Sequence, residues 1–292
     1  MFSDTPFHLK HLRDRGVDVG PELAALAERD TFFALDIGTE SNDMNPRSDA
    51  ARTAIESIQD PQTKTKIEAM LHFSLGIWPG KEAILRRAEA VAELRANLDA
   101  ARRDPFLAPR IAAIGECGLD HHWNPAGVDK RSQDDFDARV FAGEAELFEA
   151  LLSLGLDTDL PVIVHSREAF DGTMSCMAHS GVTRGVMHCF SYGIPEARAV
   201  LNQGWYISFS GSITYARKSA LEESRELLRF VPRDRLLIET DAPYLAPGPH
   251  RGKTNTPVWV EEVYRCAAER LDMRAEDLSR LVDGNIRALF RL

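Results

Sequence analysis

Five side chains that can bind a divalent metal ion are spread along this sequence, each at or just after the end of a short apolar run. They are His8, Glu116, His165, His188 and Asp241. Histidine and carboxylate together suit a divalent cation that keeps an open coordination position for water. Such a cation lowers the pKa of its bound water to about 7, which supplies hydroxide at neutral pH. The set therefore predicts metal-assisted hydrolysis.

Glu116 is the central member of this set, and its carboxylate could bridge two cations. Two cations roughly 3.5–4 Å apart can hold both the attacking and the leaving oxygen of a phosphoryl displacement. Each residue also has an ordinary structural explanation: a histidine can be hydrogen-bonded in a core, and Glu116 can pair with Arg110 or Arg167. Asp241 can cap the turn before Pro243. The prediction therefore depends on the five residues together.

The elements that would position these side chains recur regularly along the chain. Short apolar runs, rich in β-branched and aromatic residues, predict strands buried on both faces, and the stretches between them have helical spacing of apolar residues. The runs are residues 1–7, 31–37, 72–77, 111–116, 160–165, 184–189, 205–209 and 235–239. The helical stretches are residues 21–29, 81–99, 135–154, 169–179, 195–202, 219–230, 257–271 and 275–291.

Alternating strands and helices predict an α/β protein with a single (β/α)8 TIM barrel, here one metal-dependent hydrolase domain over residues 1–292. An open doubly wound sheet is the alternative. It needs a glycine-rich phosphate turn after an early strand, which this sequence lacks. Because the carboxyl ends of all barrel strands face one mouth, the metal-binding side chains would converge there.

The amino-acid composition argues against some classes of protein. Lys and Arg number 35 against 45 Asp and Glu, a net charge of −10, which argues against a protein that coats nucleic acid. An enzyme with a locally basic or metal-loaded cleft remains compatible with that charge. The four cysteines lack CxxC spacing, and we see neither a signal peptide nor an apolar run long enough to span a membrane. We therefore expect reduced thiols, a cytoplasmic location and, in the absence of a marked dimer surface, a monomer.

Three further residues are expected to face the substrate. Arg167 lies two residues after His165, and Lys253 lies in the loop after the last apolar run. A cationic side chain there can hold a phosphate, arginine through two parallel hydrogen bonds. Trp78 can stack on a nucleic-acid base. Ion pairing and core packing are the alternatives for these residues, and His11 is expected to face solvent.

Several segments of the chain match one known family in order along nearly the whole sequence. They are IGECGLD (114–120), PVIVHSR (161–167), MHCF (187–190), YISFSG (206–211), LIETDAPYLAP (237–247) and RGK (251–253). With these segments the chain resembles the TatD-type metal-dependent deoxyribonucleases.

The resemblance implies a (β/α)8 barrel and divalent-metal-dependent hydrolysis of DNA phosphodiester bonds. The histidine and carboxylate ligands admit Mg²⁺, Mn²⁺ or Zn²⁺, with one or two ions per chain. The resemblance also implies a 3′-to-5′ exonuclease that acts on DNA, with single-stranded ends as the expected substrate. The ligands implied by the matching segments are Glu116, His165, His188 and Asp241.

Two positions depart from the family pattern. Members usually begin with a His-x-His pair at the end of the first strand; His8 fits the second histidine, but Pro6 stands in place of the first. Trp78 precedes Pro79 where the family usually has a histidine. Proline cannot bind a metal ion, so the ion held by that pair would lose one ligand, and both one-metal and two-metal centres stay open.

Within the nuclease hypothesis, Glu116 and Asp241 are the predicted catalytic residues. Asp241 is the candidate base that takes a proton from the attacking water. A second hypothesis keeps the metal barrel but changes the substrate to another ester or an amide, for example an aminoacyl ester on an RNA end. A third is a degenerate, non-catalytic homologue, which Pro6 and Trp78 would favour.

Overall fold

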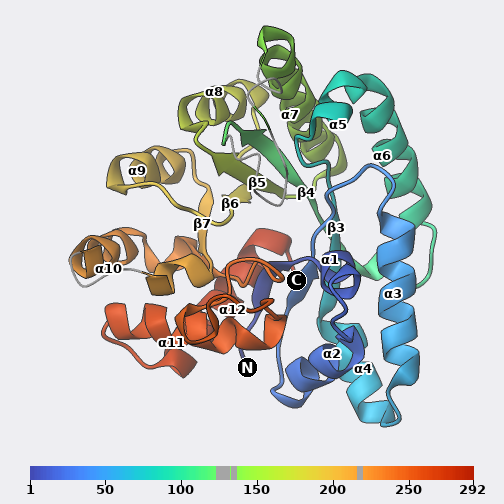
Figure 1. Ribbon diagram of the computed structural model, residues 1–292, viewed down its shortest axis with the longest axis vertical. Helices are drawn as coiled ribbons and strands as arrows, with labels where there is room; N and C mark the ends of the chain where they lie inside the picture. The colour runs from blue at the N-terminus through green and yellow to red at the C-terminus, as the bar shows by residue number, and fades with distance from the viewer. Residues whose placement is uncertain (123–131, 133–136, 216–219) are drawn as a thin grey trace.

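Eight parallel strands form one sheet in the computed structural model, which describes residues 1–122, 132, 137–215 and 220–292. The sheet order follows the chain order, and the helices lie around the outside of the strands (Figure 1). This arrangement confirms the predicted (β/α)8 barrel. The strands are β1 (Asp4–Phe7), β2 (Ala34–Asp36), β3 (Leu71–Leu75), β4 (Ile111–Asp120), β5 (Val162–Arg167), β6 (Gly185–Met187), β7 (Tyr206–Phe209) and β8 (Leu236–Ile238).

The first and last strands are joined just beyond their carboxyl ends. The backbone N–H of His8 donates to the carbonyl oxygen of Ala242 at 2.7 Å, and the N–H of Asp241 donates to the carbonyl oxygen of Pro6 at 3.0 Å. These two bonds nearly close the barrel. They also fix the two loop residues that carry predicted metal-binding side chains.

Every predicted apolar run contains or overlaps a strand, but β4 extends beyond the predicted end at Glu116. Its last residues pair with β5, with Gly118 opposite His165 and Asp120 opposite Arg167. Gly118 has φ +153°, and a Cβ there would lie 1.8 Å from the carbonyl oxygen of His165. Glycine is therefore required for β4 to pass so close to β5.

The helices cover the outside of the barrel and differ from prediction in several places. The predicted helix over 81–99 is broken at Arg86 into two, and the start of the one predicted over 135–154 lies outside the described residues. The α-helices are α1 (Leu9–Asp14), α2 (Val19–Glu28), α3 (Met44–Ser57), α4 (Pro61–Met70), α5 (Lys81–Leu85), α6 (Arg87–Ala101), α7 (Ala138–Thr158), α8 (Phe170–Ser180), α9 (Ile194–Asn202), α10 (Leu221–Phe230), α11 (Val260–Arg270) and α12 (Ala275–Phe290). Short 3-10 segments are η1 (Ala108–Arg110), η3 (Gly211–Tyr215), η5 (Arg233–Arg235), η6 (Gly248–His250) and η7 (Pro257–Trp259).

Helices α1, α3 and α4 were not predicted. The buried face of α3 is built mainly from small side chains, Ala50, Ala51 and Ala54, so its apolar stripe is weak in the sequence. Helix α4 buries Ile67 and Met70 and begins with a proline suited to the first helical turn. None of the described helices is long and apolar enough to cross a bilayer.

A buried arginine ties together the carboxyl ends of β2 and β3. Arg47, 1% exposed, donates from Nε to Asp43 Oδ1 at 2.9 Å and from Nη1 to Asp36 Oδ2 at 2.9 Å. Its Nη2 donates to the carbonyl oxygen of Ser74 at 2.7 Å. The other carboxylate oxygen of Asp36 accepts from the backbone N–H of Leu9 at 2.8 Å. Arg47 therefore connects two strand ends to the start of α1.

Replacement of Arg47 by methionine should lower the free energy of unfolding by about 3–5 kcal/mol, because it leaves the carboxylates of Asp36 and Asp43 buried without their cation. Urea denaturation measures this loss. Arg95→Met is the matched control: Arg95 also makes a 2.8 Å pair, with Asp157, but both side chains are about half exposed, so about 0–1 kcal/mol is expected there. Equal losses in the two variants would contradict the structural role of Arg47.

Candidate metal centre

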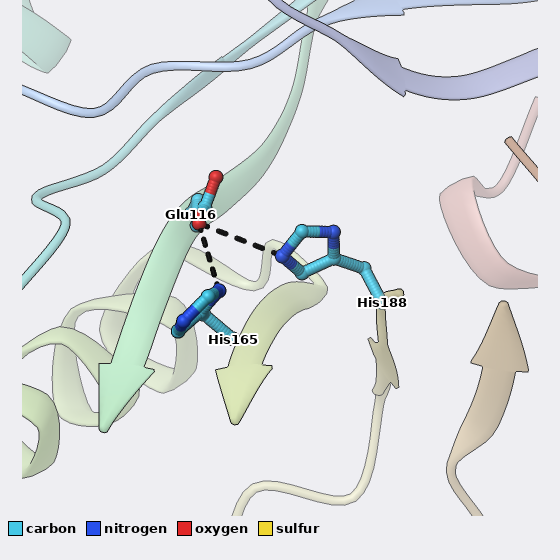
Figure 2. Close-up of side chains that lie close together, drawn as sticks. All are labelled: Glu116, His165 and His188. Atoms are coloured by element: carbon cyan, nitrogen blue, oxygen red, sulfur yellow. Dashed lines mark ion pairs between the residues drawn. The ribbon is translucent and has the colours of Figure 1, made fainter. Parts of the chain in front are cut away.

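The carboxylate of Glu116 lies at the centre of a buried cluster at the mouth of the barrel. Its Oε1 is 3.0 Å from Nδ1 of His165 and 3.5 Å from Nε2 of His188. Figure 2 shows both imidazoles directed at the same carboxylate. Its Oε2 is 3.8 Å from Nε2 of His8, which in turn is 3.2 Å from Oδ1 of Asp241. The structure thus brings the five predicted metal-binding side chains together.

Strand ends and backbone hydrogen bonds hold these side chains in place. Glu116 is on β4 and donates its backbone N–H to the carbonyl oxygen of Gly38 at 2.8 Å. His188 directly follows β6 and donates its N–H to the carbonyl oxygen of Val164, on β5, at 3.0 Å. Asp241 follows β8 with φ +56°, an uncommon backbone conformation for a residue with a side chain.

The spacing of these atoms fits a divalent cation. Ligands about 2.1 Å from one ion, at angles of 90° to 109°, lie about 3.0–3.4 Å apart. The distances from Glu116 Oε1 to His165 and His188, 3.0 and 3.5 Å, fall in or next to that range. Both ring nitrogens of His188 are buried, and although carboxylate oxygens lie 3.4 and 3.5 Å from them, neither contact in the described part of the chain has the geometry of a hydrogen bond. A cation between Glu116 and His188 would satisfy one of them.

The pKa of each ionisable group in the cluster depends strongly on its neighbours. Burial alone would raise the pKa of Glu116, but His188 and His165 outweigh it and hold that pKa well below its usual value. Burial would lower the pKa of His165, but Asp120 and Glu116 raise it to about 9. The pKa of His188 is raised well above its usual value, since Glu116 and Glu239 outweigh burial. Because metal ions bind neutral imidazole, binding must release these protons.

The two oxygens of Glu116 face two different donor sets. Oε1 faces His165 and His188, whereas Oε2 faces His8, the partner of Asp241. Pro6 lies beside the second set and contributes a backbone carbonyl to Asp241, but no ligand side chain. The second set therefore offers one fewer side-chain donor than a site with histidine at position 6 would.

The three predicted substrate-facing residues differ in how exposed they are. Trp78 is partly buried, and its ring lies edge-on to the imidazole of His165 with centroids 6.3 Å apart. Arg167 is exposed at the end of β5, and Lys253 is exposed in the loop after η6. Neither forms an ion pair within residues 1–122, 132, 137–215 and 220–292. Both are therefore open to a ligand.

The prediction for His11 was wrong. The residue is only partly exposed, since its ring stacks on His8 with centroids 4.9 Å apart and its Nδ1 lies 3.2 Å from Oη of Tyr244. Helix α1 starts directly after His8, and residues three apart share a helix face. Burial and the neighbouring His8 lower the pKa of His11 to about 4, so its ring is neutral near pH 7.

Two residues near the metal-binding side chains were not singled out from the sequence. Oδ2 of Asp120 is 3.0 Å from Nε2 of His165. Oε1 of Glu239 is 3.4 Å from Nδ1 of His188 and accepts the backbone N–H of Cys189 at 2.7 Å. Glu239 ends the predicted run 235–239, so the rule that selected the five metal-binding residues would have found it, whereas Asp120 lies beyond the predicted end of its run at Glu116.

Comparisons of this sequence with known proteins agree on one protein family. The sequence model of the family described as TatD related DNase matches residues 4–291. The metal-dependent hydrolase YcfH of Escherichia coli K12 is 37% identical over 184 residues, covering 62% of this chain and 63% of that protein. YabD of Bacillus subtilis, a metal-dependent hydrolase by name, is 35% identical over 185 residues, covering 63% and 66%. The chain thus spans a little less than two thirds of the length of these two relatives.

A Pantoea vagans protein named 3′-5′ ssDNA/RNA exonuclease TatD is 33% identical over 190 residues, 63% of this chain and 67% of that one. Among solved structures, the TatD homologue YjjV of Escherichia coli superimposes with a TM-score of 0.77 at 25% identity, covering 100% of this chain and 98% of that one. A TatD-family hydrolase of Entamoeba histolytica has a TM-score of 0.72 at 19% identity, covering 99% and 97%, and supports the fold alone.

After dialysis against Mn²⁺ or Zn²⁺, the wild-type protein should retain at least one ion per chain by elemental analysis. Glu116→Gln should bind metal at least about 100-fold more weakly, because removal of one charge from a buried paired site costs about 3–5 kcal/mol. Glu168→Gln is the control, since Glu168 is exposed and pairs at 2.7 Å with His122, outside the cluster. If Glu116→Gln retains as many ions per chain as the wild type, the metal ion binds elsewhere in the protein.

Proposed function

The chain belongs to the family of TatD-related DNases, and from this premise we propose that it cleaves DNA phosphodiester bonds as a divalent-metal-dependent 3′-to-5′ exonuclease. The observation that carries the proposal is the position of Glu116, whose two oxygens face two donor sets at the barrel mouth. A shared carboxylate between two such sets suits phosphoryl displacement. The exonuclease name of the Pantoea vagans relative supports the same substrate class.

In this proposal Glu116, His165 and His188 would hold one cation, and His8 with Asp241 would hold or orient a second. The donor set of histidine and carboxylate admits Mg²⁺, Mn²⁺ or Zn²⁺. A cation bound there would supply Lewis acidity toward a phosphoryl oxygen and lower the pKa of water. Asp241 takes the proton of the attacking water, and its 3.2 Å contact with His8 keeps the carboxylate oriented toward the cluster.

The substrate is held by residues around the mouth. The partly exposed ring of Trp78, beside His165, offers a stacking surface for a base near the end of a single strand. The exposed side chains of Arg167 and Lys253 provide the cations for its phosphates. Because the chain as a whole carries a net charge of −10, such local cations must provide the attraction to DNA.

We further propose that residues 1–292 act as one catalytic domain in the cytoplasm. The four cysteines, Cys117, Cys176, Cys189 and Cys266, are all free thiols, which suits a reducing compartment.

Asp241→Asn should reduce metal-dependent cleavage of single-stranded DNA by about 10²–10⁴-fold, because the amide cannot accept the proton of the attacking water. Glu116→Ala should abolish cleavage. Release of nucleotides from a 5′-labelled oligonucleotide measures both. Asp171→Asn, an exposed carboxylate on α8, should cleave like wild type. Undiminished cleavage by Asp241→Asn would contradict its role, and wild-type activity on esters or amides but none on DNA would contradict the substrate.

Trp78→Leu should raise KM for a single-stranded oligonucleotide by about 5- to 150-fold, because loss of stacking on one base costs about 1–3 kcal/mol. The internal control is the same oligonucleotide with an abasic 3′ end, which offers no base to stack. Wild type should discriminate between the two substrates and the variant should not. If the variant discriminates as strongly as wild type, Trp78 is not the stacking surface.

A further inference from the structure

Each of the two histidines beside Glu116 faces a second carboxylate on its opposite ring nitrogen. His165 lies between Glu116 Oε1 at its Nδ1 and Asp120 Oδ2 at its Nε2, both at 3.0 Å. His188 has Glu116 Oε1 at 3.5 Å from its Nε2 and Glu239 Oε1 at 3.4 Å from its Nδ1. The same order, carboxylate–imidazole–carboxylate, thus occurs twice in one cluster.

Both outer carboxylates are buried and anchored by backbone. Asp120, 1% exposed, accepts the N–H of His122 at Oδ1 and donates its own N–H to Glu144 at 2.8 Å. Glu239, 0% exposed, accepts the N–H of Cys189 at 2.7 Å. These bonds fix the position of each carboxylate behind its imidazole. A buried carboxylate needs a proton donor or a cation beside it, and the imidazoles fill that place.

His8 has carboxylates at only one of its ring nitrogens, unlike His165 and His188, which each have one at both. Its Nε2 faces Asp241 and Glu116, but its Nδ1 is buried without a hydrogen-bond partner in the described part of the chain. Ring packing holds it instead, with His11 stacked at 4.9 Å and Tyr244 edge-on at 5.5 Å between centroids. No carboxylate therefore lies behind this ring to hold a proton on Nδ1, the nitrogen that faces away from Asp241 and Glu116.

We propose that Asp120 and Glu239 are positioning residues that keep a proton on Nε2 of His165 and on Nδ1 of His188, which leaves Nδ1 of His165 and Nε2 of His188 free to bind a cation beside Glu116. Neutral imidazole carries one proton, and a carboxylate behind the ring determines which nitrogen bears it and raises the basicity of the other. The half of the centre with His165 and His188 therefore binds its cation more tightly than the half with His8. This inference rests on the metal centre of the proposed function.

The test uses Co²⁺ as the probe, titrated into the full-length protein and followed by calorimetry and visible absorption. Asp120→Asn and Glu239→Gln keep the size of each side chain and remove its charge. Loss of such a partner lowers metal affinity by about 10- to 100-fold. If two Co²⁺ ions bind, we expect this loss for the ion that binds with the higher affinity. Glu168→Gln, whose partner His122 lies outside the cluster, should bind Co²⁺ like wild type. Unchanged Co²⁺ affinity in both cluster variants would overturn the proposal.

Nitrogen-15 NMR of the histidine rings in the Zn²⁺-loaded wild type gives a second readout that needs no variant. We expect a proton on Nε2 of His165 and on Nδ1 of His188, and zinc-shifted resonances from the other two nitrogens. The reverse pattern would overturn the proposal even if the variants do not fold. Thermal unfolding in chelator and then with metal gives a third readout, because the positioning variants should gain less stability than wild type when metal is added.

These results are distinguishable from failure of the proposed function. If the wild type binds Co²⁺ but does not cleave DNA, the proposed substrate is wrong, and the affinities of the two variants still decide the roles of Asp120 and Glu239. If the wild type binds no Co²⁺, the metal centre and this inference are both wrong.

Discussion

The burial of the Glu116 carboxylate is the constraint on which the rest of the site depends. A carboxylate that is 5% exposed is stable only if positive charge or proton donors surround it. The surrounding histidines supply protons when no cation is bound, and a divalent cation can take their place. Since His8, His165 and His188 come from three separate strand ends, one buried charge links distant parts of the chain.

The barrel provides this arrangement through close backbone contacts and buried side-chain hydrogen bonds. Gly118 lets β4 pass close to β5, which places Asp120 behind His165. Arg47 fixes the ends of β2 and β3, and through Asp36 it fixes the start of α1 next to His8. A rigid frame of this kind keeps ligands at metal-binding spacing before any metal arrives, which is the purpose of a preorganised site.

Sequence patterns were sufficient to predict the barrel, because strands buried on both faces must be short, apolar and regularly spaced. The convergence of the five metal-binding side chains followed from the same logic, since strand ends share one mouth. Helix α3 was missed because alanines give its buried face little hydrophobic contrast. The extension of β4 to Asp120 was missed because it depends on register against β5, which periodicity does not encode. The partners of individual ring nitrogens, such as Glu239 for His188, depend on side-chain direction and needed three-dimensional geometry.

The contact between His8 and Asp241 joins residues 233 positions apart, and this separation sets an order of events during synthesis. At about 5–20 residues per second, a ribosome needs roughly 10–50 s to travel from one to the other. Throughout that interval His8 has been made but lacks its carboxylate partner, and the first strand lacks the edge that nearly closes the barrel. Glu116, His165 and His188 are all made earlier than Asp241. Any sheet that forms in the nascent chain before then lacks its last strand, which both closes the fold and completes the site.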